Sequence, residues 1–270
     1  SLSASLARRS AVSGIAAMLG AVIGGYLILA TDPGVGIVAN GLLTLPLVIF
    51  LISFRPLVAL KPIRAHSRPT HDIFSRLRNN PQLQRVAVVA VAMPLLVIPV
   101  ITMIVPILND LDHAPLPSGA GLMLAGVAGG RLLVPYLTKR LLNHRQELAA
   151  ALWAEIWTSG FMIILAASVL FPLSDFDLVV WTIIGFGLGA SRFTEGTLAT
   201  AAAAKSGAKS DEVMNIAVFM TIGIFCSPVG VLLWGFMIEY IGAPSTVAIS
   251  AVAMIAVVLV LAGQSRPARR

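Results

Sequence analysis

The sequence has few charged side chains. Asp, Glu, Lys and Arg make up 11% of its 270 residues, whereas apolar residues make up 57%. A soluble globular domain has about 25% charged residues, so this chain lacks the polar side chains needed to cover a surface in water. We infer that its apolar residues face the lipid bilayer, and we expect an integral membrane protein.

Cysteine is nearly absent, and histidine is absent from the long apolar runs. The single cysteine, Cys226, excludes a disulfide or a cysteine-based metal site within one chain. The four histidines fall between the apolar runs, at His66, His71, His113 and His144. The runs also lack an H-E-x-x-H motif and a serine–histidine pair, and the chain has no P-loop. The sequence therefore predicts no enzyme, no metal and no cofactor, and it disfavours an intramembrane enzyme.

Acidic residues are outnumbered by basic ones, 12 to 19, which gives a net charge of +7. A basic chain is compatible with nucleic-acid binding. The basic residues, however, form short stretches between apolar runs, a distribution that is typical of membrane orientation. We therefore expect no nucleic-acid partner.

Eight apolar segments are long enough to cross a bilayer, which takes about 20 helical residues. They are 12–30, 36–54, 86–108, 119–137, 148–171, 178–203, 213–238 and 245–263. Lipid cannot satisfy exposed backbone groups, so spanning segments are helices or closed barrels. Because the runs are continuously apolar rather than alternating, they exclude a β-barrel. The expected fold is all-α and polytopic, with eight transmembrane helices.

The charged residues between these segments are sorted by side. If the first end is cytoplasmic, all 19 Lys and Arg residues lie in inside segments except Arg131 and Arg192, which lie within spans. The outside loops carry acids instead, at Asp32, Asp110, Asp112, Asp175 and Asp177. This sorting follows the positive-inside rule. It predicts a multi-pass protein of the plasma membrane, taken as a bacterial inner membrane, with both ends cytoplasmic.

One connection is long: residues 55–85 form a basic linker that divides the spans into two plus six. Short motifs lie on both sides of it. They are Gly20-Ala-Val-Ile-Gly24-Gly25-Tyr26, Asp32-Pro33-Gly34, Leu77-Arg78-Asn79-Asn80-Pro81-Gln82-Leu83, Gly126-Val-Ala-Gly-Gly130 with Tyr136-Leu-Thr-Lys139-Arg140, and Ser227-Pro228-Val229-Gly230. These motifs, together with the two-plus-six division of the spans, resemble the major facilitator superfamily. The resemblance is closest to its enterobactin-exporter-like and macrolide-efflux-like branch. The stretch Asp211-Glu212-Val213-Met214 departs from that branch, because it lacks the arginine expected there.

This resemblance implies a major-facilitator-like fold without its first four helices. Residues 1–54 would be the last two helices of the N-terminal bundle, 55–85 a cytoplasmic linker, and 86–270 the six-helix C-terminal bundle with a short basic tail. A start at Ser1 instead of Met favours processing or a fragment. The implied activity is secondary active transport of small molecules by alternating access, as a proton-coupled exporter of drug-like or siderophore-like substrates. We expect the 270 residues alone not to transport.

Four charged residues fall within the spans: Arg131, Glu155, Arg192 and Glu195. A charge at the bilayer centre costs about 2.5–3.5 kcal/mol on insertion scales, so such residues usually face a cavity or pair. Arg192 and Glu195 are three residues apart and share a helix face. Our hypothesis is that Glu155 or Glu195 exchanges a proton during transport. The alternatives are a static ion pair that fixes packing and, for Arg131, a side chain that snorkels to the surface.

Three kinds of residue within the spans predict how the helices pack. Glycine pairs predict close approach, prolines predict bends, and one amide predicts a hydrogen bond between helices or a place in the pathway. The G-x-x-x-G pairs permit close helix contact and occur at Gly20/Gly24, Gly126/Gly130 and Gly185/Gly189. The last pair only superficially resembles a nucleotide fingerprint, because it lies in a membrane span. Pro94, Pro99 and Pro106 predict a kinked helix, whose bends either serve gating or are fixed, and Pro228 is a further candidate for helix packing or gating. Asn215 either lines the pathway or bonds between helices.

A non-transporting membrane scaffold or regulatory protein is the main alternative function. It predicts that the charges within the spans are dispensable and that they line no internal cavity.

Overall fold

The computed structural model describes residues 2–30, 75, 77–109, 118–171 and 177–264, and the single positions 38, 42, 45, 49 and 53. The regular elements of this described part are all helical. They are α1 (Leu2–Ala30), α4 (Pro81–Leu96), α5 (Ile98–Thr102), α6 (Ile104–Asn109), α7 (Ser118–Gly130), α8 (Val134–Leu142), α9 (Glu147–Leu170), α10 (Asp177–Ala204), α11 (Glu212–Ile241) and α12 (Ala243–Gly263). A 3₁₀ turn over Arg131–Leu133 joins α7 to α8.

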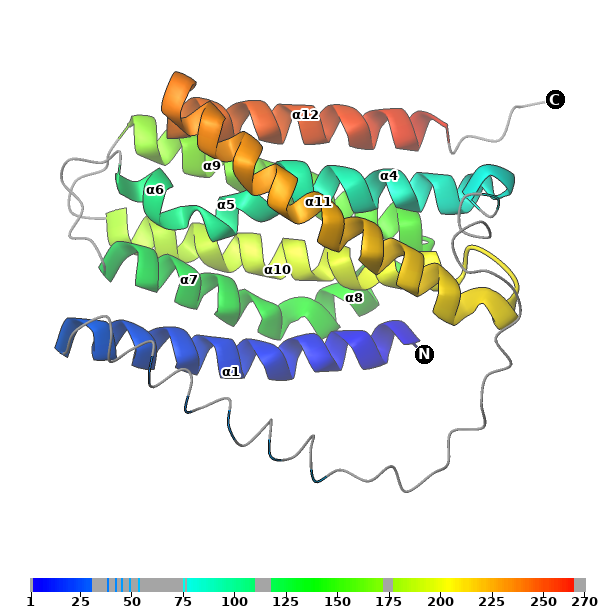
Figure 1. Cartoon of the computed structure of the whole chain (residues 1–270), viewed down its shortest axis with the longest axis horizontal. Helices are drawn as coiled ribbons and strands as arrows, with labels where there is room; N and C mark the ends of the chain where they lie inside the picture. The colour runs from blue at the N-terminus through cyan, green and yellow to red at the C-terminus, as the bar shows by residue number, and fades with distance from the viewer. Residues whose placement is uncertain are drawn as a thin grey trace.

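Helix α10 lies at the centre of the bundle. It packs against α7 on one side and α9 on another, while α12 packs on α9 and α11 packs on α4. Helix α1 packs mainly on α7, α8 and the turn between them. The helices lie side by side and alternate in direction, and α11 crosses the others obliquely (Figure 1).

Five described helices have the length and composition to cross a membrane. They are Pro81–Thr102, Gly119–Leu142, Glu147–Leu170, Glu212–Ile241 and Ala243–Gly263. They correspond to five of the eight predicted spans. Two other predicted spans, 12–30 and 178–203, fall on the long helices α1 and α10, and 36–54 lies almost entirely outside the described residues.

Several helix boundaries differ from those expected from hydropathy. Helix α1 begins at Leu2 rather than near residue 12, since Arg8 and Arg9 are compatible with a helix although they interrupt the apolar run. Helix α4 begins at Pro81 rather than 86. Its N-cap is Asn80, whose side-chain oxygen accepts hydrogen bonds from the backbone N–H groups of Gln82 and Leu83. Hydropathy thus marks the apolar part of a helix and not its ends.

Polar contacts tie several helix ends together at one end of the bundle. Lys205, after α10, pairs with Glu147 at the start of α9. The Arg85 guanidinium near the start of α4 donates to the carbonyl of Gln264, which follows α12, at 2.6 Å. Helix α1 begins and α12 finishes at this same end (Figure 1), as expected for helices that alternate in direction.

The predicted span 86–108 is an interrupted helix. Helix α4 continues through Pro94 but stops at Leu96, and short breaks occur at Val97 and Met103. Pro99 has no N–H to donate to the carbonyl four residues earlier, that of Leu95. The Trp234 indole of α11 donates to this carbonyl instead, at 3.1 Å. The break is therefore stabilised by a contact from another helix.

Pro106 lies within α6, and Pro228 lies within α11, which runs unbroken from Glu212 to Ile241. Pro228 therefore does not interrupt its helix. Near it, Gly230 brings α11 against the α4 backbone: a Cβ there would clash with the Pro94 carbonyl. This close approach was not among the predicted glycine contacts.

Two of the predicted G-x-x-x-G pairs face each other. A Cβ added at Gly126 or Gly130 would clash with the α10 backbone, and one added at Gly185 or Gly189 would clash with the α7 backbone. The α7 and α10 backbones therefore touch, which only residues without side chains permit. Gly20 is different, because a Cβ there would meet no atom of the described residues within 4 Å. The surroundings of Gly24 lie outside the described part of the chain.

Candidate functional site

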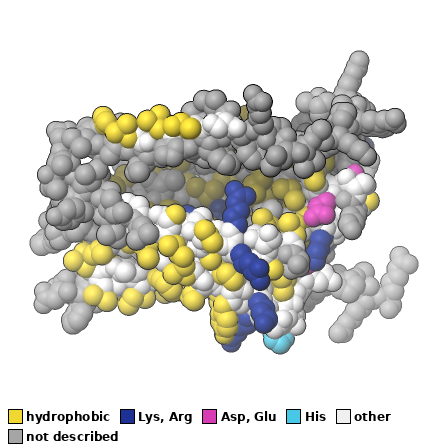
Figure 2. Space-filling model, turned by 90° about the horizontal axis from the view of Figure 1, so that it is seen from below, with side chains coloured by type: hydrophobic (Ala, Val, Ile, Leu, Met, Phe, Trp, Pro, Cys, Tyr) yellow, Lys and Arg dark blue, Asp and Glu magenta, His cyan; other side chains and the backbone are white. Residues whose placement is uncertain are grey.

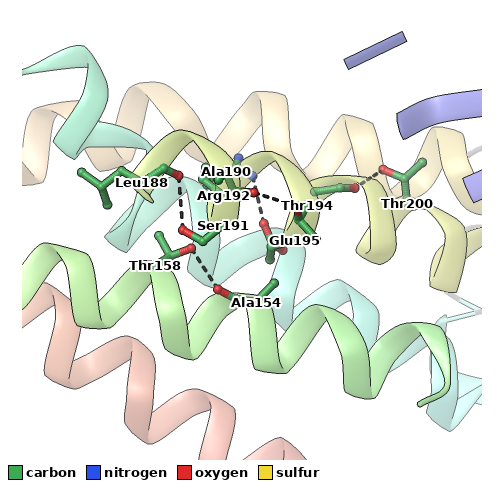
Figure 3. Close-up of polar contacts among 10 residues, drawn as sticks. Ala154, Thr158, Leu188, Ala190, Ser191, Arg192, Thr194, Glu195 and Thr200 are labelled. Atoms are coloured by element: carbon green, nitrogen blue, oxygen red, sulfur yellow. Dashed lines mark hydrogen bonds and ion pairs between the residues drawn. The ribbon is translucent and has the colours of Figure 1, made fainter. Parts of the chain in front are cut away.

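The interface between α9 and α10 contains a group of buried polar side chains. Glu155, Thr158 and Ser159 of α9 and Ser191, Thr194 and Glu195 of α10 are all at most 1% exposed. Figure 3 shows Thr158, Ser191 and Glu195 between the two helices, with Arg192 beside Glu195. An otherwise apolar helix pair therefore carries a polar interior, which we term the α9–α10 polar cluster.

Arg192 and Glu195 form an ion pair along α10. The distance between Arg192 Nη1 and Glu195 Oε2 is 2.9 Å. The Glu195 side chain is fully buried, whereas that of Arg192 retains 11% exposure. The three-residue spacing therefore places both groups on one helix face, as expected. The second carboxylate oxygen, Oε1, has no hydrogen-bond partner among the described residues.

Glu155 is the second acid of the cluster, and its surroundings differ from those of Glu195. Its side chain is 0% exposed, and neither carboxylate oxygen has a hydrogen-bond partner in the described part. It lies close enough to Glu195 and Arg192 for their charges to act on it. Two carboxyl groups therefore share the influence of one guanidinium, which is already paired with Glu195.

The hydroxyl groups of the cluster mostly bond to their own helix. Thr158 donates to the Ala154 carbonyl at 3.1 Å, Ser191 to that of Gly187 at 2.8 Å, and Thr194 to that of Ala190 at 2.7 Å. Such bonds to the preceding turn are how Ser and Thr are accommodated inside apolar helices. They leave the Glu155 carboxyl without a donor from these three side chains.

Arg131 lies in the 3₁₀ turn between α7 and α8 and contacts two other helices. Its guanidinium lies over the ring of Phe193 of α10, 3.6 Å from the centroid, and its Nη1 is 3.5 Å from the Ser13 hydroxyl of α1. A Cβ at Gly14 would approach Arg131 Cβ to 2.6 Å, so α1 passes directly against this turn. No sequence pattern singles out Ser13, Gly14 or Phe193, because their role depends on how the helices pair.

Asn215 is separate from the α9–α10 polar cluster. It is 2% exposed and lies near the start of α11. With Asn80, Gly207 and Asp211 it lines a cavity of about 330 Å³ at the loop between α10 and α11. Asn80 also donates to the carbonyl of Ser206 in that loop. The structure therefore joins Arg192, Glu195 and Glu155 but places Asn215 apart from them.

Comparison with known proteins identifies one family. Residues 2–210 match the family model described as Major Facilitator Superfamily. The comparisons with curated proteins and with solved structures gave no match.

Proposed function

Because this chain belongs to the Major Facilitator Superfamily, whose members are membrane transporters rather than enzymes, we propose that it serves proton-coupled secondary transport by alternating access. The observation that carries this proposal is Glu155. It is a fully buried acid with no hydrogen-bond partner among the described residues, next to an acid that has an arginine.

The role of Glu155 follows from the energetics of buried charge. An ionised carboxylate without partners is costly in an apolar interior, so its proton is retained unless water or a cation arrives. Glu195 has a guanidinium partner, which stabilises its charged form. We assign proton binding to Glu155. Because Arg192 acts on both acids, the protonation of Glu155 also depends on whether Glu195 is charged.

Residues 1–54 and 86–270 are assigned to different bundles in this proposal. They are the last two helices of the N-terminal bundle and the six-helix C-terminal bundle, joined by the linker 55–85. The way α1 packs on α7 and α8 supports an interface between the two parts. Substrate would bind near the membrane midplane between the bundles, where broken helices commonly form transporter sites.

The finer assignment is export. We propose efflux of drug-like or siderophore-like small molecules, on the motifs that resemble the enterobactin-exporter-like and macrolide-efflux-like branch. Both ends would be cytoplasmic in a bacterial inner membrane. Support comes from the shared end at which α1 begins and α12 finishes (Figure 1) and from the sorting of basic residues in the loops.

The test measures transport and proton binding separately. Efflux of fluorescent drug-like compounds is followed in cells that express the proposed two-bundle carrier of which these residues form part, with and without a protonophore. Infrared difference spectroscopy of the purified chain follows the carbonyl stretch of a protonated carboxyl group. We expect Glu155→Gln to abolish protonophore-sensitive efflux and to remove that band. Glu239→Gln, at an exposed acid of α11, should change neither.

Full proton-coupled efflux in Glu155→Gln, at normal expression, would end the assignment of proton binding to Glu155, and the same result in Glu195→Gln as well would end the proposal. It would favour the scaffold alternative, in which the buried charges only fix the packing of α9 and α10. Efflux by the isolated 270 residues in liposomes would contradict the assignment of these residues to part of a larger two-bundle carrier.

A further inference from the structure

A cleft lies between the first turns of α1 and one side of α8. Its volume is about 300 Å³. Ser3 and Ala7 of α1 and Thr138 of α8 are buried at its wall, while Arg8 and Lys139 are exposed and also line it. It is separate from the α9–α10 polar cluster, with which it shares no residue.

The charged residues that line this cleft are all basic. Arg8 and Lys139 are among its lining residues, no acid is, and Arg9 and Arg140 follow each of them in the sequence. Seen from the α1 side, Lys and Arg side chains gather in a band across the surface, with a largely hydrophobic surface on one side of it (Figure 2). Two ammonium or guanidinium groups at one opening match an anion in charge.

A buried hydroxyl group in the cleft lacks a partner. Thr138 is 3% exposed, and its Oγ1 has no hydrogen-bond partner in the described part of the chain. Buried polar groups are almost always hydrogen-bonded. A ligand oxygen in the cleft would satisfy the Thr138 hydroxyl, and the exposed amide of Asn143 at the same cleft offers further donors.

The position of the cleft favours a lipid over a soluble anion. It lies at the end of the membrane-length helix Gly119–Leu142, so it sits at headgroup depth. Tyr136 of the same helix, α8, is 60% exposed. Tyrosine is enriched where a membrane protein meets the interface between lipid and water. Leu142 and Pro135 add apolar wall for the first carbons of an acyl chain.

We propose that this cleft binds the phosphate group of an anionic phospholipid. Arg8 and Lys139 contact the phosphate oxygens, and the Thr138 hydroxyl donates to one of them. Because the two basic residues come from α1 and α8, a bound lipid links these two helices. The proposal does not depend on proton coupling or on the direction of transport.

Native mass spectrometry of the full chain tests this site, with phosphatidylglycerol and phosphatidylcholine offered in equal amounts. We expect phosphatidylglycerol to be preferred, and the double variant Arg8→Gln/Lys139→Gln to weaken its binding about tenfold. The matched control Arg9→Gln/Arg140→Gln removes the same charge beside the cleft and should bind like the unmodified chain. Thr138→Val should weaken binding by about threefold, and Lys139→Arg should preserve it.

Three results would overturn the proposal. Equal losses of phosphatidylglycerol binding in the double variant and its control would show that the lipid responds to the net charge of this surface and not to the cleft. Equal binding of the two lipids would exclude recognition of the net negative charge. Binding of glycerol 3-phosphate as tight as that of phosphatidylglycerol would assign the cleft to a soluble anion. Elution from size-exclusion chromatography as a single monodisperse species confirms that each variant is folded. If the double variant is not folded, the binding measured for Thr138→Val tests the proposal instead.

Discussion

Glu155 and Glu195 are equally buried but have different partners. Glu195 has Arg192 at 2.9 Å, whereas neither oxygen of Glu155 has a partner among the described residues. Removing one member of a buried pair leaves an uncompensated charge, which is more damaging than removing both. The stability of variants therefore separates a structural ion pair from an acid that carries protons.

We expect Arg192→Gln to destabilise the chain by about 1–3 kcal/mol, because the Glu195 carboxyl then remains buried without the partner that bonds to it. The double variant Arg192→Gln/Glu195→Gln should recover most of this loss. Thermal unfolding in detergent, followed by circular dichroism, measures both. A double variant as unstable as Arg192→Gln would show that the pair contributes through something other than charge compensation.

Which residues carry charge inside the spans was evident from the sequence, since Arg131, Glu155, Arg192 and Glu195 interrupt apolar runs. That Arg192 pairs with Glu195 followed from their spacing on one helix. That Glu155 lies beside them did not, because it depends on how α9 packs against α10. The stacking of Arg131 on Phe193 was missed for the same reason: it joins residues from helices whose pairing no local pattern records.

At the level of helices, the contact between α7 and α10 depends on four glycines. A methyl group at Gly189 would lie far inside the van der Waals distance of the Val127 carbonyl oxygen. We expect Gly189→Ala to destabilise the chain by about 1–3 kcal/mol, as overpacking does. Gly20→Ala is the matched control, since its added methyl meets none of the described residues within 4 Å, and it should be neutral or stabilising. Unfolding in detergent compares the two, and equal stability would contradict the close contact.

The break after α4 offers a second test at this level. The Trp234 indole donates to the Leu95 carbonyl, which lacks the donor that Pro99 cannot supply. Trp234→Phe should therefore cost about 1 kcal/mol from the lost hydrogen bond, apart from any change in packing. In a Pro99→Ala background, residue 99 has an N–H of its own, and the same substitution should cost less. Equal costs in both backgrounds would show that the indole is not replacing the backbone donor.

The positions of the helices in the sequence were more predictable than the contacts between them. The spans 148–171, 213–238 and 245–263 correspond closely to α9, α11 and α12, because length and hydropathy suffice to define a membrane helix. The glycine pairs of α7 and α10 were recognised as contact points, but their mutual pairing was not predicted. Gly14 and Gly230 were not predicted as helix contacts, because neither has a second glycine at the spacing that signals one.

Over the whole molecule, the sidedness of the loops can be tested with the single native cysteine. We start from Cys226→Ala, which leaves no thiol in the chain, and introduce Ser67→Cys in the linker or Ser174→Cys between α9 and α10. A membrane-impermeant maleimide added to intact cells should label the residue-174 variant and not the residue-67 variant, because the linker is basic and the other loop acidic. Labelling of the linker from outside would reverse the proposed orientation.

The ion pair of α10 has a consequence for how the chain is built into the membrane. Because Arg192 and Glu195 are on the same helix, their charges can neutralise each other as soon as that helix has formed, before any neighbour has arrived. A pair shared between helices would have to enter the lipid as two separate charges. In an insertion assay on the isolated segment, Glu195→Ala should therefore lower the inserted fraction of α10, although it removes a charge, and an unchanged or higher fraction would show that the pair forms only after assembly.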